Sequence, residues 1–186
     1  MKIFIDQGHN PQNPNAGAEA NGVREQDVTY AVGVALAELL RANPFFEVRL
    51  SRNSPTEQLG TSTVTSLAAR TNAANEWGAD YFISLHCNAS PNTAASGSEV
   101  YVYSETSPAF PLGEDILVGL QNETGLPNRG MFIRPSLFVL RRTKMPALLV
   151  EMGYLTNPTD ARLLSEDPDS FARGIYHGML AYFQLL

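Results

Sequence analysis

Two of the three histidines in this chain lie at the ends of short apolar segments that are typical of buried strands. His9 follows residues 3–8 (IFIDQG), and His86 follows residues 81–85 (YFISL). A third apolar segment, residues 147–150 (ALLV), ends on Glu151. In open α/β sheets, ligands bind outside the carboxyl ends of the strands, so these three side chains should converge on one cleft. Nitrogen ligands with a carboxylate, and a further carboxylate that acts as a base, make up a hydrolytic zinc site.

Glu25 supplies a further carboxylate, and its position allows two interpretations. It lies in the first turn of an expected helix, where a carboxylate stabilises the helix dipole by about 0.3 to 1 kcal/mol. It also lies at the far end of the loop that leaves His9, which runs from residue 10 to residue 21 before the helix begins. A loop of this kind can fold back and place both side chains on one metal ion.

Helical and extended patterns alternate along the whole chain, which predicts a three-layer α/β domain. No internal repeat or linker interrupts the pattern, so we expect a single domain over residues 1–186. The expected helices are residues 25–41, 66–77, 108–124, 159–164 and 169–185, and Gly78 and Gly125 are placed to end the second and third of them. After the first strand, the expected strands are residues 46–50, 81–86, 98–103, 137–140 and 147–150.

The composition is that of an ordinary globular protein. Hydrophobic residues make up 44% and charged residues 17% of the 186 positions, which excludes a disordered chain. The apolar runs are far shorter than the roughly 20 residues of a membrane-spanning helix. The net charge of −6 argues against a nucleic-acid partner, because phosphate binding needs a basic surface.

The N-terminus enters a strand directly, without the apolar stretch of a secretory signal. We therefore expect either a domain taken from a larger secreted chain or export by another route. The single cysteine, Cys87, rules out an internal disulfide. It could be a thiol nucleophile or a metal ligand, but neighbours on a strand face opposite ways, so we expect it to be a small buried residue that faces away from His86.

The order of short motifs resembles the zinc-dependent N-acetylmuramoyl-L-alanine amidases, the family-three cell-wall amidases. The resemblance runs from residue 2 to the end of the chain. No single motif is specific to the family, but the whole series of motifs in this order is. Its main blocks are residues 6–9 (DQGH), 22–25 (GVRE), 50–52 (LSR), 70–75 (RTNAAN), 78–80 (GAD), 84–89 (SLHCNA), 97–103 (GSEVYVY) and 145–157 (MPALLVEMGYLTN). Asn10 and Pro11 replace glycines that usually follow the first histidine in this family, so we expect a differently shaped cleft rim.

The resemblance implies a fold, a metal site and a substrate. The implied fold is a twisted mixed sheet of about six strands with helices on both faces. The implied ligands of one zinc ion per chain are His9, Glu25 and His86, and the implied catalytic glutamate is Glu151. The implied substrate is peptidoglycan, cut at the amide between the lactyl group of N-acetylmuramic acid and the first L-alanine of the stem peptide.

The sequence offers further candidate site residues and leaves alternative functions open. Arg129 is a candidate to bind a carboxylate of the stem peptide, and Asn88 and Ser84, on the strand face of His86, are candidates to line the site or orient its ligands. We expect a monomer that acts in the cell wall, as an autolysin or a phage lysin. The alternatives are a zinc peptidase that cleaves within stem peptides and a catalytically idle wall-binding domain.

Overall fold

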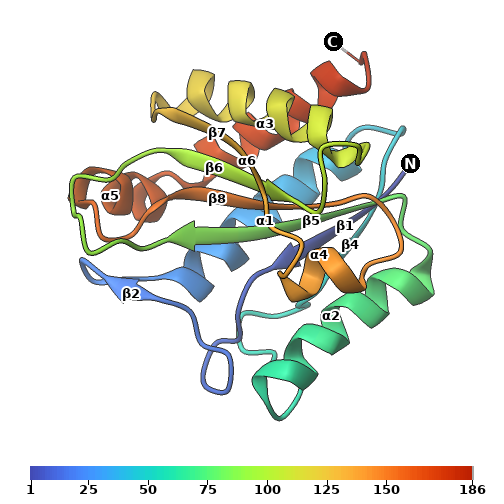
Figure 1. Cartoon of the computed structure of the whole chain (residues 1–186), viewed down its shortest axis with the longest axis horizontal. Coiled ribbons are helices and arrows are strands. Elements are labelled where there is room, and N and C mark those ends of the chain that lie inside the picture. Colours follow the sequence, from blue (N-terminus) through green and yellow to red (C-terminus); the bar gives the residue numbers. More distant parts are fainter. Residues whose placement is uncertain (186) are drawn as a thin grey trace.

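A six-stranded mixed sheet forms the middle layer of the molecule (Figure 1). The computed structural model describes residues 1–185. The strand order is β4-β1-β5-β8-β6-β7, in which β4, β1, β5 and β8 are parallel, and β6 pairs antiparallel with β8 and parallel with β7. The expected α/β class is confirmed. The strands are β1 Lys2–Gln7, β4 Glu47–Leu50, β5 Tyr81–Asn88, β6 Ser98–Val102, β7 Asn128–Ile133 and β8 Ala147–Tyr154.

Helices cover both faces of the sheet (Figure 1). The larger core lies under α1, α3 and α6, and the smaller core lies under α2 and α4. Successive side chains of β1 point to opposite faces of the sheet, so Ile3 and Ile5 lie in the larger core and Phe4 lies in the smaller core. The helices are α1 Glu25–Arg41, α2 Thr63–Trp77, α3 Ala109–Thr124, α4 Phe138–Arg142, α5 Pro158–Glu166 and α6 Pro168–Tyr182. None of them, within residues 1–185, has the length and apolar character to cross a membrane.

The ends of α2 and α3 follow the local signals in the sequence. Ser62 caps α2 through the backbone N–H of Thr65, whose side chain in turn accepts from the backbone N–H of Ser62. Gly78 ends α2 and Gly125 ends α3, each in the left-handed conformation, with φ of 67° and 70°. Both glycine positions are confirmed as helix terminators.

Two expectations for the region after α3 are wrong. Residues 137–140 are not a strand, because Leu137 is the N-cap of α4 and the helix begins at Phe138, with Val139 and Leu140 buried in the smaller core. The edge strand of the sheet is instead β7, in a segment where no strand was expected. A run of four apolar residues carries no period that separates a strand from a helix. β7 is a half-exposed edge strand whose register against β6 shifts near Gly130.

The strands that carry the candidate site residues are longer than expected. β5 continues to Asn88 and β8 continues to Tyr154, so His86 and Glu151 lie within strands and not at their last residues. The loop after His9 also contains structure, because β2 (Glu19–Ala20) and β3 (Val23–Arg24) form a small antiparallel hairpin. This hairpin leads directly into Glu25, the first residue of α1.

Candidate metal and catalytic site

Three segments that are distant in the sequence bring His9, Glu25 and His86 together. His9 lies two residues after β1 in a left-handed backbone conformation, with φ of 68°. Glu25 begins α1, and its backbone N–H donates to the carbonyl of Ala18 in the returning loop at 2.9 Å. His86 lies on β5, which pairs directly with β1. The loop therefore folds back as expected, and Glu25 faces both histidines.

The carboxylate of Glu25 lies between the two imidazole rings. Its Oε1 is 3.0 Å from Nε2 of His9 and 3.0 Å from Nδ1 of His86. One donor atom from each of the three residues lies within 4.8 Å of the others. Gly17 makes room for this arrangement, because a Cβ there would lie 2.7 Å from Cβ of Glu25 and 3.0 Å from Cδ2 of His9.

The chemistry of these donors fits a zinc ion. Burial raises the pKa of Glu25, but hydrogen bonds and charge interactions with His86 and His9 outweigh it and hold the pKa well below its usual range. The carboxylate is therefore an anion, and Nδ1 of His9 is buried with no hydrogen-bond partner within residues 1–185. Two imidazoles and one carboxylate are an established ligand set for catalytic zinc, with one coordination position left open.

Glu151 lies beside this group and is not part of it. It is the cross-strand partner of His86 in the parallel β5–β8 register. Its Oε2 is buried and has no hydrogen-bond partner in the part of the chain that the structure describes. Burial, followed by the negative charges of Glu25 and Glu99, raises the pKa of Glu151 to about 8. A carboxyl group with this pKa can both take up and release a proton near neutral pH.

Glu99 is a third carboxylate at the site, and the sequence does not predict its place there. It lies opposite Glu151 across the antiparallel β6–β8 pair. Its Oε1 accepts from Nε of Arg129 at 2.7 Å and from the hydroxyl of Tyr154 at 2.5 Å, and its Oε2 accepts from the hydroxyl of Tyr101 at 2.8 Å. Burial raises the pKa of Glu99, but these hydrogen bonds and the charge of Arg129 outweigh burial and lower it.

The two candidate substrate-binding residues, Arg129 and Asn88, lie on the side of the site where Glu99 and Tyr101 are. Arg129 lies on β7, with its side chain 40% exposed and its guanidinium 5.3 Å from the centroid of the Tyr154 ring. Asn88 lies at the end of β5 and faces the hydroxyl of Tyr101 at 3.5 Å. Ser84 does not approach the imidazoles through its hydroxyl, which donates to Asp6 at 2.7 Å.

Cys87 faces away from the cleft, as expected for the neighbour of His86 on a strand. Its side chain belongs to the larger apolar core and is 4% exposed. Burial, followed by the charges of Glu25 and Glu151, raises the pKa of the thiol well above its usual range. The prediction that Cys87 is a small buried residue is therefore confirmed, since a thiol that stays protonated is neither a nucleophile nor a metal ligand.

The chain is similar to known proteins along nearly its whole length. Residues 3–181 match the family described as N-acetylmuramoyl-L-alanine amidase. The N-acetylmuramoyl-L-alanine amidase CwlM of Bacillus licheniformis is 37% identical over 188 residues, which span 100% of this chain and 70% of that protein. The endolysin of Bacillus phage SPP1 is 31% identical over 95% of this chain and 62% of its own length.

A solved structure agrees with these sequence comparisons. The catalytic domain of CwlV, an N-acetylmuramoyl-L-alanine amidase from Bacillus (Paenibacillus) polymyxa var. colistinus, has the same fold with a TM-score of 0.85. It is 30% identical to this chain, and the match covers 100% of this chain and 99% of that domain. This chain therefore belongs to the N-acetylmuramoyl-L-alanine amidase family.

Proposed function

We propose that this chain is a zinc-dependent cell-wall hydrolase that cleaves the amide between the lactyl group of N-acetylmuramic acid and L-alanine in peptidoglycan. The main observation in favour of a metal ion is the position of the Glu25 carboxylate, which lies 3.0 Å from an imidazole nitrogen of His9 and 3.0 Å from one of His86. Family membership supports the choice of bond. The names of the relatives, a bacterial amidase and a phage endolysin, support action in the cell wall.

His9, Glu25 and His86 are the residues that would hold the metal. Bound there, zinc would polarise the amide carbonyl, lower the pKa of water beside it, and offset the charge of Glu25 that raises the pKa of Glu151. The anionic state of Glu25 and the two ring nitrogens on either side of it support this assignment.

Glu151 is the residue that would move the proton. Its ionised carboxylate takes a proton from water as the water oxygen bonds to the amide carbon. The protonated carboxyl group then gives this proton to the alanine nitrogen as the carbon–nitrogen bond breaks, because an amine is a poor leaving group until it is protonated. The products are a muramic acid with a free lactyl carboxylate and an intact stem peptide with a free amine.

Arg129 is the residue that we propose to bind a carboxylate of the stem peptide, with Asn88 lining the same side. Glu99 occupies Nε of Arg129 and the ring of Tyr154 lies against its guanidinium, so the side chain is held in place while 40% of it stays exposed. Among residues 1–185, its Nη1 makes only a long contact, 3.5 Å, with the carbonyl of Ser96. A guanidinium held along one edge can bind a carboxylate with two parallel hydrogen bonds along another.

Product analysis on a purified muropeptide tests the reaction. The protein supplied with zinc should release the intact stem peptide and a muramic acid with a free lactyl carboxylate, identified by mass spectrometry, and Glu151→Gln should release neither at a comparable rate. Fragments of the stem peptide would instead identify a peptidase. Binding to cell walls without any cleavage would identify an idle wall-binding domain.

A further inference from the structure

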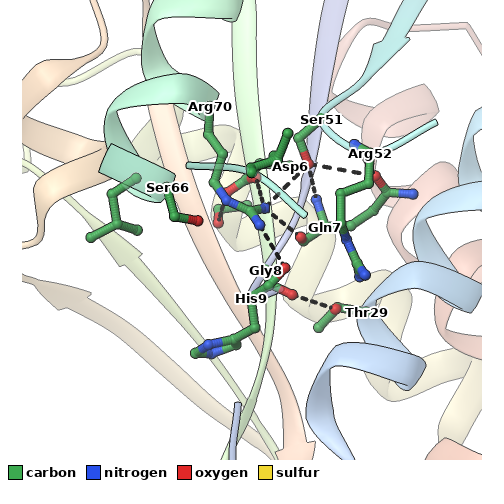
Figure 2. A network of polar contacts seen from close by, with 12 residues as sticks. Asp6, Gln7, Gly8, His9, Thr29, Ser51, Arg52, Ser66 and Arg70 are labelled. Carbon is green, nitrogen blue, oxygen red and sulfur yellow. Dashed lines mark hydrogen bonds and ion pairs between the residues drawn. The ribbon is translucent and has the colours of Figure 1, made fainter. Parts of the chain in front are cut away.

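A buried polar network lies behind His9, on the side away from the imidazole ring (Figure 2). At its centre, Nη1 of Arg70 from α2 lies 2.7 Å from Oδ1 of Asp6 on β1. Neither side chain is more than 1% exposed. A buried ion pair is weak evidence for stability, because removing two charges from water costs about as much as their attraction returns. The network therefore calls for an explanation other than stability.

Arg70 and Thr29 hold three successive backbone carbonyls at the candidate metal site. Arg70 donates from Nη1 to the carbonyl of Gln7 at 2.6 Å and from Nη2 to the carbonyl of His9 at 2.5 Å. Thr29, on α1, donates from Oγ1 to the carbonyl of Gly8 at 2.7 Å. Figure 2 shows the guanidinium and the threonine hydroxyl reaching this segment from different helices. The backbone that leads into His9 is thus fixed by side chains, and not by strand pairing alone.

The backbone of His9 needs such support. Its φ of 68° lies in the left-handed region, which residues other than glycine rarely adopt. A residue stays in this region only when its surroundings hold it there, and such residues concentrate at functional sites. The hydrogen bond from Arg70 to the His9 carbonyl acts on this residue directly.

The same network reaches the segments that carry the other two candidate ligands. Oδ2 of Asp6 accepts from the hydroxyl of Ser84 at 2.7 Å, and Ser84 lies two residues before His86 on β5. Thr29 lies one helical turn after Glu25 on α1, on the same side of the helix. One set of buried hydrogen bonds therefore links β1, β5 and α1 immediately behind the three ligand side chains.

We propose that Arg70 and Thr29 are positioning residues that set the zinc affinity of the site. They hold the carbonyls of Gln7, Gly8 and His9, so that the His9 ring faces Glu25 before the metal binds. The inference rests on the proposed function, because it requires that His9, Glu25 and His86 hold zinc. Residues that orient metal ligands commonly change metal affinity by 10- to 100-fold when they are substituted.

Two threonines provide a matched pair of variants. Thr29→Val removes the hydroxyl that holds the Gly8 carbonyl, with little change in shape. Thr71→Val makes the same change at an equally buried position on α2, where the hydroxyl donates to the carbonyls of Leu67 and Ala68 in its own helix. Thr29→Ser keeps the hydroxyl and serves as the rescue. Arg70→Lys keeps a positive charge beside Asp6 but offers one nitrogen in place of two.

The experiment measures the zinc dissociation constant of each metal-stripped protein by competition with a chromophoric chelator, and its thermal unfolding without metal. We expect Thr29→Val and Arg70→Lys to bind zinc about 10- to 100-fold more weakly, and Thr71→Val and Thr29→Ser to bind it like the wild type. Thr29→Val should lose more thermal stability than Thr71→Val, because it leaves the Gly8 carbonyl without its donor while the carbonyls of Leu67 and Ala68 keep their helical partners, so zinc affinity is compared well below the unfolding temperature of each variant.

The outcomes separate this inference from the proposed function. If the wild type binds zinc and Thr29→Val binds it as tightly as Thr71→Val does, the network only supports the fold and the inference is wrong. If the wild type itself binds no stoichiometric zinc, the metal site is wrong and the inference falls with it. Should Arg70→Lys fail to fold, the two threonine variants still decide the question.

Discussion

Replacing Glu151 with glutamine should stabilise the metal-free protein, and the gain should grow with pH. Burial and the charges of Glu25 and Glu99 raise the pKa of Glu151 from 4.5 to about 8. Between these two values the folded protein keeps a proton that the unfolded chain has released. The folded state binds more protons in this range, so the free energy of unfolding of the wild type falls as pH rises from 4.5 to about 8 and levels off above that. Glutamine cannot ionise and escapes this loss.

The structure sets an upper limit on the effect. A change of one pKa unit corresponds to 1.36 kcal/mol, so a pKa of about 8 in place of 4.5 corresponds to at most about 5 kcal/mol. The advantage of Glu151→Gln over the wild type should be near zero at about pH 4.5 and approach this limit above about pH 8. Zinc should reduce the advantage, because a cation beside Glu25 offsets one of the charges that raise the pKa.

Urea unfolding in the presence of a chelator, followed by circular dichroism from about pH 5 to pH 9, measures this directly. Glu114→Gln makes the same substitution at an exposed position on α3 and serves as the control variant. A difference between Glu151→Gln and the wild type that is constant with pH would refute the reasoning. Glu151 would then have an ordinary pKa in the metal-free protein, and the raised pKa would no longer support its role in releasing a proton near neutral pH.

Three further results are expected. His86→Ala should lose stoichiometric zinc on dialysis, measured by elemental analysis, because one of three ligands is gone; full retention would show that the ligand set is wrong. Gly8→Ala should weaken zinc binding in the chelator competition, because the new Cβ would clash with the backbone carbonyl oxygen of Leu85 and would lie 2.6 Å from the ring of His86. Affinity equal to the wild type would show that the shift of β1 against β5 does not reach the ligands. Activity should fall on acidification, because protons compete with the metal for the imidazole nitrogens. Added zinc should move the acidic side of the pH–activity profile to lower pH. If this side of the profile stays in place at saturating zinc, metal binding does not limit the reaction.

The sequence alone predicts the elements with strong local signals. The helical spacing of apolar residues in α1 and the glycines that end α2 and α3 are visible without any tertiary contact, and the structure has them as predicted. The convergence of His9 and His86 follows from parallel strands that both end at one edge of the sheet. The short segments are different, because α4 depends on packing against the smaller core and β7 depends on pairing with β6.

The part of the site that the sequence does not predict is set by pairing between distant strands. The alternation of residues 98–103 predicts a strand that carries Glu99, but only the antiparallel β6–β8 register places Glu99 opposite Glu151. Arg129 approaches Glu99 because β7 pairs with β6, and this pairing has no local sequence signal. Arg70 likewise reaches the His9 carbonyl across 61 residues of chain.

The central claim is that Glu25 binds zinc and that Glu151 moves the proton. These two roles predict different effects on zinc binding when each glutamate is replaced. Glu25→Gln should weaken zinc binding, because a neutral amide is a poorer ligand for a divalent cation than a carboxylate. Glu151→Gln should keep zinc near the wild-type level while hydrolysis of muropeptide falls by about 10² to 10⁴, the usual contribution of a positioned general base.

The most direct test is therefore to measure zinc retention and muropeptide hydrolysis in parallel for Glu25→Gln, Glu151→Gln and the wild type. The account predicts that Glu25→Gln loses zinc and that Glu151→Gln keeps zinc but loses turnover. The opposite result, in which Glu151→Gln loses zinc while Glu25→Gln keeps both zinc and activity, would contradict it. Glu151 would then be the metal ligand, and Glu25 would only stabilise the start of its helix.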